Sequence, residues 1–104
     1  MSQLPSSLQS LLTASAENVD DAWSVFVAEY SPLLLHVARS VSHGRDQAMD
    51  AYAHVLEQLR RDQCQRLRRY ETDPRSRFTT WLVIVCRRLC VDFHRAHFGR
   101  ARAE

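Results

Sequence analysis

The sequence contains no lysine, only two glycines and three prolines, and no long run of apolar residues. Glycine and proline are needed in the many turns of a β-sandwich or barrel, so their scarcity favours helices joined by short connections. Because no apolar run approaches the ~20 residues that span a bilayer, we expect no membrane-spanning segment. The first residues also lack a basic stretch followed by an apolar run, so we expect no secretory signal peptide.

Cysteine is scarce as well, and its three positions, Cys64, Cys86 and Cys90, are an odd number. An odd count without a secretory signal favours reduced thiols in a cytoplasmic protein. Cys86, Cys90, His94 and His97 are spaced by four, four and three residues, which would align them along one side of a helix. Four such side chains span about 16 Å, too far for one ion, so we expect no metal site and interpret Cys86 as a small buried thiol.

The patterns of common catalytic sites are also missing. No Ser-His-Asp set, no paired carboxylates and no glycine-rich phosphate loop is visible in the sequence. We therefore expect a protein that is not an enzyme and that requires no cofactor.

The charged residues are unevenly distributed. The first 62 residues carry four arginines against eight acidic residues, whereas the last 42 carry ten arginines against four. This asymmetry favours an acidic surface for one partner and a basic surface for a polyanion such as nucleic acid. The exclusive use of arginine has two explanations that composition does not separate. One is the codon bias of a G- and C-rich genome, and the other is selection for planar donors that grip phosphates.

Apolar residues recur every three or four positions, which predicts an all-α bundle of three or four helices. We expect a short amphipathic helix over residues 3–15. A long helix should run from an N-cap at Asn18 or Asp20 to about Val41, with a kink or brief break near Ser31, just before Pro32. With 104 residues, the chain fits one domain. We divide it into a short N-terminal helix (1–16), a main helical domain (17–98) and a basic tail (99–104).

The second half of the bundle is predicted from capping signals. Asp46 should cap a helix with Met49 on its apolar stripe, reaching about Leu67. Residues 70–77 are polar and charged and predict a loop. Asp73 followed by proline is a typical helix start, and we expect the last helix to run from there to Gly99.

Several short stretches follow one another in a distinctive order. They are Phe26, Tyr30, Pro32 and Leu33; Asp46-Gln47-Ala48-Met49-Asp50 with Val55, Leu56 and Leu59; Phe78-Thr79-Thr80-Trp81-Leu82; Val85-Cys86-Arg87-Arg88; and Asp92-Phe93-His94-Arg95. This ordered series resembles region 2 of bacterial extracytoplasmic-function (ECF) sigma factors. The resemblance covers about residues 8–98 and implies the compact helical fold of sigma region 2. The chain stops before the family's second helical domain, so we expect either an excised domain or a shortened relative.

The resemblance implies, first, docking on the core RNA polymerase. In the family, the polar face of the helix that corresponds to residues 46–62 packs on a coiled coil of the β′ subunit. The implied docking residues are Asp46, Asp50, Ala53, His54 and Glu57. Ala53 stands where the family usually has glutamine, which removes an expected hydrogen bond. A solvated helix face is the alternative interpretation.

The second implied function is to hold a base of the opened non-template strand of the promoter −10 element outside the stack. In the family, the loop before the last helix forms the pocket for this base, and Tyr70 is the candidate stacking ring. Arg88 and Arg95 share a helix face and can line one groove. Arg88 stands where the family usually has asparagine. Because arginine can only donate hydrogen bonds, we expect the promoter sequence that this chain recognises to differ from that of the family. The implied DNA-binding residues are Arg68, Arg69, Tyr70, Arg75, Arg77, Trp81, Arg87, Arg88, His94 and Arg95.

Other interpretations stay open beside this one. Trp81 is either exposed at the edge of the melted bubble or buried as a core anchor against the first long helix. The whole chain could be a sigma-like accessory or homodimeric protein that has lost promoter function, or an unrelated helix-turn-helix protein that prefers duplex DNA. The resemblance also implies an anti-sigma factor as a further partner.

Overall fold

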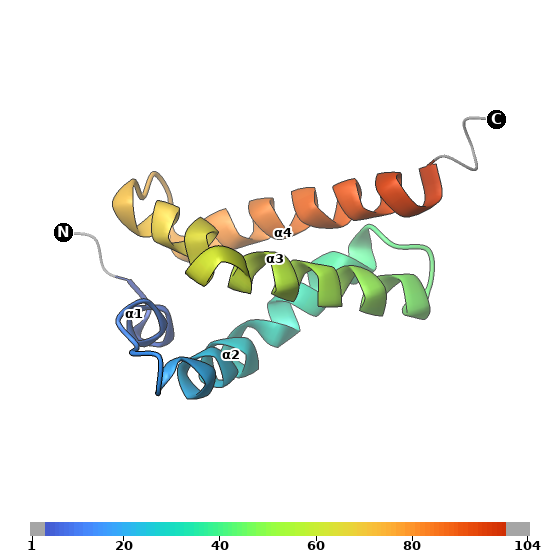
Figure 1. The fold of residues 1–104 in the computed structure, drawn as a ribbon. Coiled ribbons are helices and arrows are strands. Elements are labelled where there is room, and N and C mark those ends of the chain that lie inside the picture. The colour runs from blue at the N-terminus through green and yellow to red at the C-terminus, as the bar shows by residue number, and fades with distance from the viewer. Residues whose placement is uncertain (1–3, 100–104) are drawn as a thin grey trace.

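The computed structural model describes residues 4–99, with side chains described for residues 4–97. This part of the chain forms four α-helices and a π-helical turn: α1 (Ser6–Leu12), α2 (Val19–Ser40), α3 (Arg45–Thr72), α4 (Phe78–His94) and η1 (Arg95–Gly99). In Figure 1, α4 lies along α3, α2 crosses beneath them, and α1 packs beside the start of α2. The predicted all-α bundle is therefore confirmed. Apart from Gly99, the predicted basic tail lies outside the described residues.

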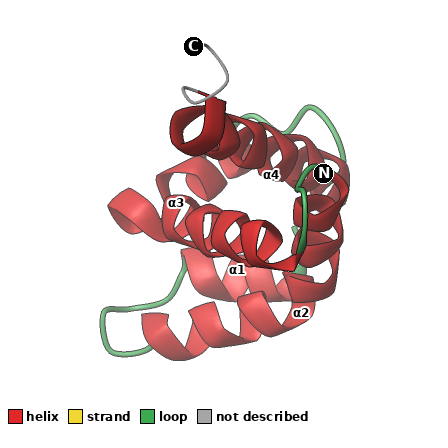
Figure 2. Ribbon diagram, turned by 90° about the vertical axis from the view of Figure 1, so that its right-hand side faces the viewer, coloured by secondary structure: helices red, strands yellow, loops and turns green. Residues whose placement is uncertain are grey.

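Helices account for most of the described chain, and the loops between them are short (Figure 2). None of the described helices is long and apolar enough to cross a bilayer.

α1 is part of the core. Leu8, Leu11 and Leu12 are buried, because they fall on the one face of α1 that meets α2 and α3. The helix is shorter than the predicted 3–15, since it begins only after Pro5 and ends at Leu12.

α2 forms because Phe26, Tyr30, Leu34 and Val37 repeat every three or four residues, and all four are buried. Of the predicted kink or break near Pro32, the break is wrong, because the helix is continuous from Val19 to Ser40. Pro32 is exposed, so water can reach the backbone carbonyl that loses its donor there.

The connection from α2 to α3 depends on Gly44. Its φ of +118° is a conformation that residues with a side chain rarely adopt. Gly44 is the N-cap of α3, so the prediction that Asp46 caps this helix is wrong. Asp46 instead lies in the first turn, where its negative charge interacts favourably with the helix dipole.

The buried face of the first half of α3 also differs from the predicted one. Met49 is 44% exposed, whereas the buried residues are Ala48, Ala51, Val55 and Leu59. The small Ala48 and Ala51 thus lie on the buried face of α3, and Met49 lies on its solvent side.

A left-handed turn divides α3 into two right-handed segments. Asp62, Gln63 and Cys64 have φ values of 55°, 59° and 62°. For residues other than glycine, this conformation costs about 1–2 kcal/mol each. The Arg68 side chain stabilises the turn, because its Nε donates to the Gln63 carbonyl (2.7 Å) and its Nη1 donates to the Leu12 carbonyl of α1 (3.1 Å).

The predicted boundaries between α3 and α4 are wrong. α3 continues to Thr72, so the connecting loop covers residues 73–77 rather than 70–77. α4 begins at Phe78 with Arg77 as its extended N-cap, and not at Asp73-Pro74. The Tyr70 hydroxyl donates to the Ser76 carbonyl (2.6 Å) and thereby holds this loop against the end of α3.

An aromatic cluster joins the helices at this end of the bundle. The Phe78 ring of α4 lies 5.3 Å from Tyr70, 5.3 Å from Tyr30 and 6.1 Å from Phe26, measured between ring centroids. These edge-on contacts add to the burial of the rings. The cluster fixes the end of α3 and the start of α4 relative to α2.

Candidate functional site

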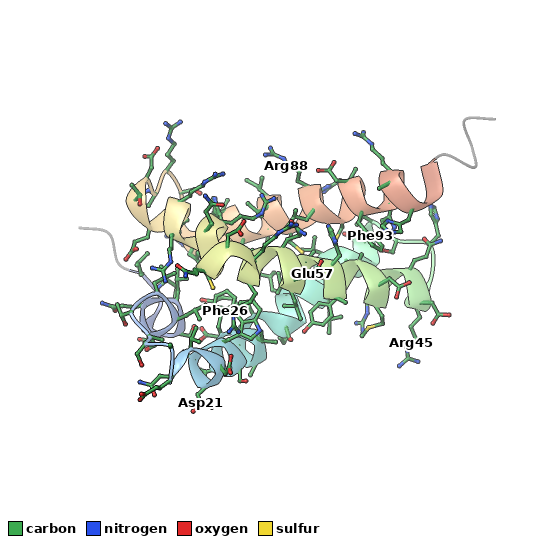
Figure 3. All side chains as sticks on the ribbon, in the orientation of Figure 1. Asp21, Phe26, Arg45, Glu57, Arg88 and Phe93 are labelled. Carbon is green, nitrogen blue, oxygen red and sulfur yellow. The ribbon has the colours of Figure 1, made fainter. Side chains whose placement is uncertain are left out.

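One face of α4 and η1 carries exposed arginines. Arg77, Arg88 and Arg95 are exposed, and Ile84 between them is 52% exposed. Ile84, Arg88 and Arg95 are separated by four and seven residues, which places them on one side of a helix, and Arg77 is the extended residue that precedes α4. Figure 3 shows Arg88 on the side of α4 that points away from α3 and α2. Arg88 and Arg95 thus share a face, which we call the basic strip; exposed Arg87 lies next to it, and exposed Asp92 lies between the two arginines.

A pocket of ≈ 500 Å³ lies beside the start of this strip. It is lined by Gln65, Arg68, Arg69, Tyr70, Thr72, Asp73 and Trp81. Most of its wall comes from the last turns of α3, with Trp81 contributed by α4 and Asp73 by the loop. This pocket lies between two helices. A further pocket of ≈ 500 Å³ lies where the sequence predicted one, between the loop residues Pro74, Arg75, Ser76 and Arg77 and the start of α4 at Phe78 and Thr79, and Tyr70 also lines it.

Tyr70 does not play the part expected of it. It lies in α3 rather than in a loop and is only 6% exposed. Its ring contacts Phe78 and Trp81, and its hydroxyl is bonded to the Ser76 carbonyl. Because the side chain is almost completely buried, Tyr70 forms part of the pocket wall and offers no open stacking surface.

Trp81 combines features of its two interpretations. The ring is partly buried, with centroids 5.1 Å from Tyr70 and 5.8 Å from Phe78. Its ring contacts are thus with one ring of α3 and one of α4, and it packs against the buried core. The remaining surface of Trp81 lines the pocket, so a planar group that enters the pocket can contact it.

The other predicted arginines differ in how far they are available. The guanidinium of Arg68 is engaged with two backbone carbonyls, and Arg75 forms an ion pair with Asp73 (3.1 Å). Arg69 lines the pocket and is exposed.

His94 lies away from the basic strip. Its Nε2 is 2.8 Å from the Ser42 Oγ, so the ring is directed at the connection between α2 and α3. Burial, followed by the nearby His43 and His97, lowers the pKa of His94. A direct contact of His94 with DNA is therefore not supported by this position.

The residues predicted to dock on polymerase lie on the first half of α3. Asp46, Asp50, Ala53 and Glu57 are exposed and spaced by four, three and four residues, so they form one acidic face. Figure 3 shows Glu57 on the side of α3 that faces the viewer. His54 lies at the edge of this face, with its ring 5.0 Å from Phe93. Burial is the main cause that lowers the pKa of His54, and nearby Glu57 opposes it.

Cys86 and Cys90 lie in the core of the bundle, as the sequence indicated for Cys86. The Cys86 thiol donates to the Leu34 carbonyl (3.8 Å). Its interaction with Cys90, followed by burial, raises the pKa of Cys86, so this thiol stays protonated. Among the residues that the structure describes, no group of three or more His, Cys, Asp or Glu side chains could hold a metal ion.

Another pocket adjoins the pocket that contains Trp81, and the sequence did not predict it. It has a volume of ≈ 300 Å³ and is lined by Gln58, Arg61, Asp62, Gln65, Arg66 and Arg69. Arg61 and Arg66 are absent from the predicted DNA-binding set, because only the left-handed turn brings them to one site. The turn itself has no glycine or asparagine that would have indicated it.

Fold and site together define an all-α domain with an acidic helix face and a separate basic face. A model of the sigma-70 region 2 family matches residues 26–98, which is well over half of the chain. The chain therefore belongs to the sigma-70 region 2 family, whose members are non-enzymatic transcription-factor domains that bind RNA polymerase core and promoter DNA. The match begins within α2, so α1 lies outside it. Neither the curated proteins nor the solved structures compared with the chain give a match.

Proposed function

We propose that this chain acts in transcription initiation as an ECF-type sigma domain. Its acidic α3 face docks on the β′ coiled coil of core polymerase, and its basic face binds the non-template strand of the −10 element. The observation that carries the proposal is the separation of two exposed surfaces of opposite charge on adjacent helices of a sigma region 2 fold. Such a separation lets one domain contact a protein and a polyanion at the same time.

In this proposal, the base extruded from the promoter strand enters the ≈ 500 Å³ pocket and contacts the free surface of Trp81. Stacking on an aromatic side chain is worth about 1–3 kcal/mol per base and offsets part of the cost of unstacking. Arg77, Arg88 and Arg95 follow the phosphates of the same strand along α4. The guanidinium of Arg88 can only donate hydrogen bonds, so its partners on the strand are acceptors such as these phosphate oxygens.

The test uses two charge-reversed variants of the full chain. D50R/E57R should lose retention by immobilised core polymerase while keeping its affinity for a single-stranded −10 oligonucleotide. R88E/R95E should show the opposite pattern. Both pairs are exposed, so thermal unfolding should stay close to wild type. If wild type is not retained by polymerase, the chain is instead a sigma-like interaction protein that has lost promoter function. Tighter binding to duplex than to single strand contradicts the proposal altogether.

Ala53 gives a sharper test of the docking surface. It is exposed at the centre of the acidic face and has no amide to offer a partner. Replacing it with glutamine should add one hydrogen bond to the interface, worth about 1 kcal/mol, or roughly fivefold in affinity for core polymerase. A53Q that leaves the affinity unchanged would show that this face does not contact polymerase.

A further inference from the structure

The arginines near the left-handed turn of α3 fall into two groups. Arg60 and Arg68 are engaged: Arg60 forms an ion pair with Asp20 (2.8 Å) and lies over the Trp23 ring, and Arg68 binds two backbone carbonyls. Within the described residues, the side chains of Arg61, Arg66 and Arg69 make no hydrogen bond and no ion pair. Two arginines near the turn thus make contacts within the protein, and three do not.

The three unengaged arginines line the ≈ 300 Å³ pocket together, although they come from both sides of the turn. Asp62 is the one acidic residue among its lining residues, so the positive charge exceeds the negative by two. Gln58 and Gln65 supply amide groups, and the wall is predominantly polar. Like charges held close together repel, and a bound anion removes that repulsion.

The backbone that builds this pocket is unusual. Residues with left-handed backbone conformations and side chains persist where the surrounding structure enforces them, and they cluster at binding sites. The turn at Asp62, Gln63 and Cys64 is enforced by Arg68, which bonds the turn to α1. The engaged arginine therefore holds the turn, and the unengaged ones point to a ligand.

We propose that Arg61, Arg66 and Arg69 form a phosphate-binding site. A guanidinium binds phosphate oxygens in a bidentate manner, which fits the residue type and the missing partners. The pocket shares Gln65 and Arg69 with the pocket that contains Trp81. A nucleic-acid strand whose base contacts Trp81 would carry its adjoining phosphodiester to this site, which is the source of phosphate we favour. That source rests on the proposed function, whereas a free phosphorylated small molecule would offer the same chemistry.

The first arm of the test observes the arginines directly. The Nε–Hε resonances of the full chain are followed by NMR during titration with a single-stranded −10 oligonucleotide and, separately, with inorganic pyrophosphate. The oligonucleotide should shift the resonances of Arg61, Arg66 and Arg69 in a saturable manner and leave that of Arg60 in place. Saturation by pyrophosphate without any effect of the oligonucleotide identifies a small molecule as the ligand. No saturable shift of the three resonances by either ligand overturns the site.

The second arm measures affinity with matched variants. R61Q/R66Q should bind the oligonucleotide about tenfold more weakly at low salt, and the slope of log K against log salt should flatten by about 0.7 for each phosphate that the variant no longer neutralises. The control R39Q/R45Q removes the same charge from exposed positions. Arg45 lies 16 residues before Arg61, which is about 24 Å along a helix. This distance exceeds the Debye length of ~10 Å, so R39Q/R45Q should change the affinity for the oligonucleotide by less than twofold.

The two arms separate failure of the site from failure of the proposed function. Equal decreases in affinity for R61Q/R66Q and R39Q/R45Q would mean that net charge alone acts, which overturns the site while DNA binding stands. If wild type binds no oligonucleotide, the proposed function is contradicted. The pyrophosphate titration then decides whether the phosphate site exists independently of DNA binding.

Discussion

The two halves of α3, before and after the left-handed turn, are alike in the core and opposite on the surface. The first half buries Val55 and Leu59 and exposes acidic side chains. The second half buries Leu67 and Tyr70, and its exposed residues include Arg69. One helix thus presents two surfaces of opposite charge while it contributes to a single core.

The turn makes this arrangement possible. In an uninterrupted helix, residues seven apart share a face, so Arg66 would follow Leu59 into the core and Cys64 would follow Glu57 into solvent. Instead Cys64 is 3% exposed and Arg66 lines a polar pocket. The left-handed turn therefore shifts the register by which α3 faces the core. The surface charge of α3 thus changes sign at the same place where its backbone makes the left-handed turn.

The largest expected effect tests whether both halves belong to one core. Leu59 and Leu67 are both fully buried, one in each half. Leu59→Ala and Leu67→Ala should each lower the free energy of unfolding by about 3 kcal/mol, since each leaves a cavity of similar size. Chemical denaturation of the two variants measures the difference. If L67A costs less than about 1 kcal/mol, the second half is only loosely attached, and the two halves do not share one core.

The sequence predicted the first half of α3 better than the second half, for a physical reason. The periodicity of the first long helix and of α4 follows core contacts that alternate with polar residues, and these helices were located correctly apart from their ends. Around Leu67 and Tyr70, arginines and polar residues dominate the sequence, which made the end of α3 look like a loop. The spacing of three between Cys64, Leu67 and Tyr70 is the signal that could have revealed a buried helical face there.

The candidate site was predictable only in part for the same reason. The strip of Arg88 and Arg95 depends on regular helix geometry, so its shared face follows from the spacing alone. The two pockets depend on the turn and on side chains that meet across helices. No local pattern in Asp62-Gln63-Cys64 indicates three left-handed residues, because the stabilising partners are Arg68 and the carbonyl of Leu12 in α1. Tertiary contacts of this kind override local preference.

A smaller effect is expected from Arg68, which holds the turn in place. Arg68→Gln removes the charged donor to the Gln63 and Leu12 carbonyls and should cost about 2 kcal/mol of unfolding free energy. The neighbouring exposed Arg69 is a matched control, and R69Q should change stability by less than about 0.5 kcal/mol. Thermal unfolding measures both variants. Equal stability of R68Q and R69Q would show that the hydrogen bonds of Arg68 do not stabilise the turn.

Gln63 provides a test in which the two halves should respond with opposite signs. Glycine adopts φ of +59° without the penalty that glutamine bears, so Gln63→Gly should raise the unfolding free energy by about 1 kcal/mol. Gln58 lies in the regular first half, where the same replacement should lower stability by about 1 kcal/mol. Because the side chain changes identically at both sites, a shared sign would contradict the left-handed turn.

The smallest effect concerns the electrostatic coupling of the two halves, which meet at His54. Burial lowers the pKa of this histidine most, Glu57 of the first half raises it, and Arg66 of the second half lowers it. Arg66→Gln should therefore raise the pKa of His54, and Glu57→Gln should lower it, as followed by NMR titration of the imidazole. R69Q removes the same charge from the second half at a residue that does not act on His54, and should leave the titration unchanged.

The consequence for stability follows from linkage. Because the pKa of His54 in the folded protein lies below its ordinary value near 6.5, the unfolded chain takes up the proton more readily as the pH falls. Stability from this group is thus fully present above about pH 6.5 and is lost as the pH falls through the lower folded pKa. R66Q narrows the difference between the two pKa values, so its melting temperature should decrease less than that of wild type between pH 7.5 and 5. An equal decrease in R66Q and wild type would mean that Arg66 does not act on His54, and the two halves would then be electrostatically independent.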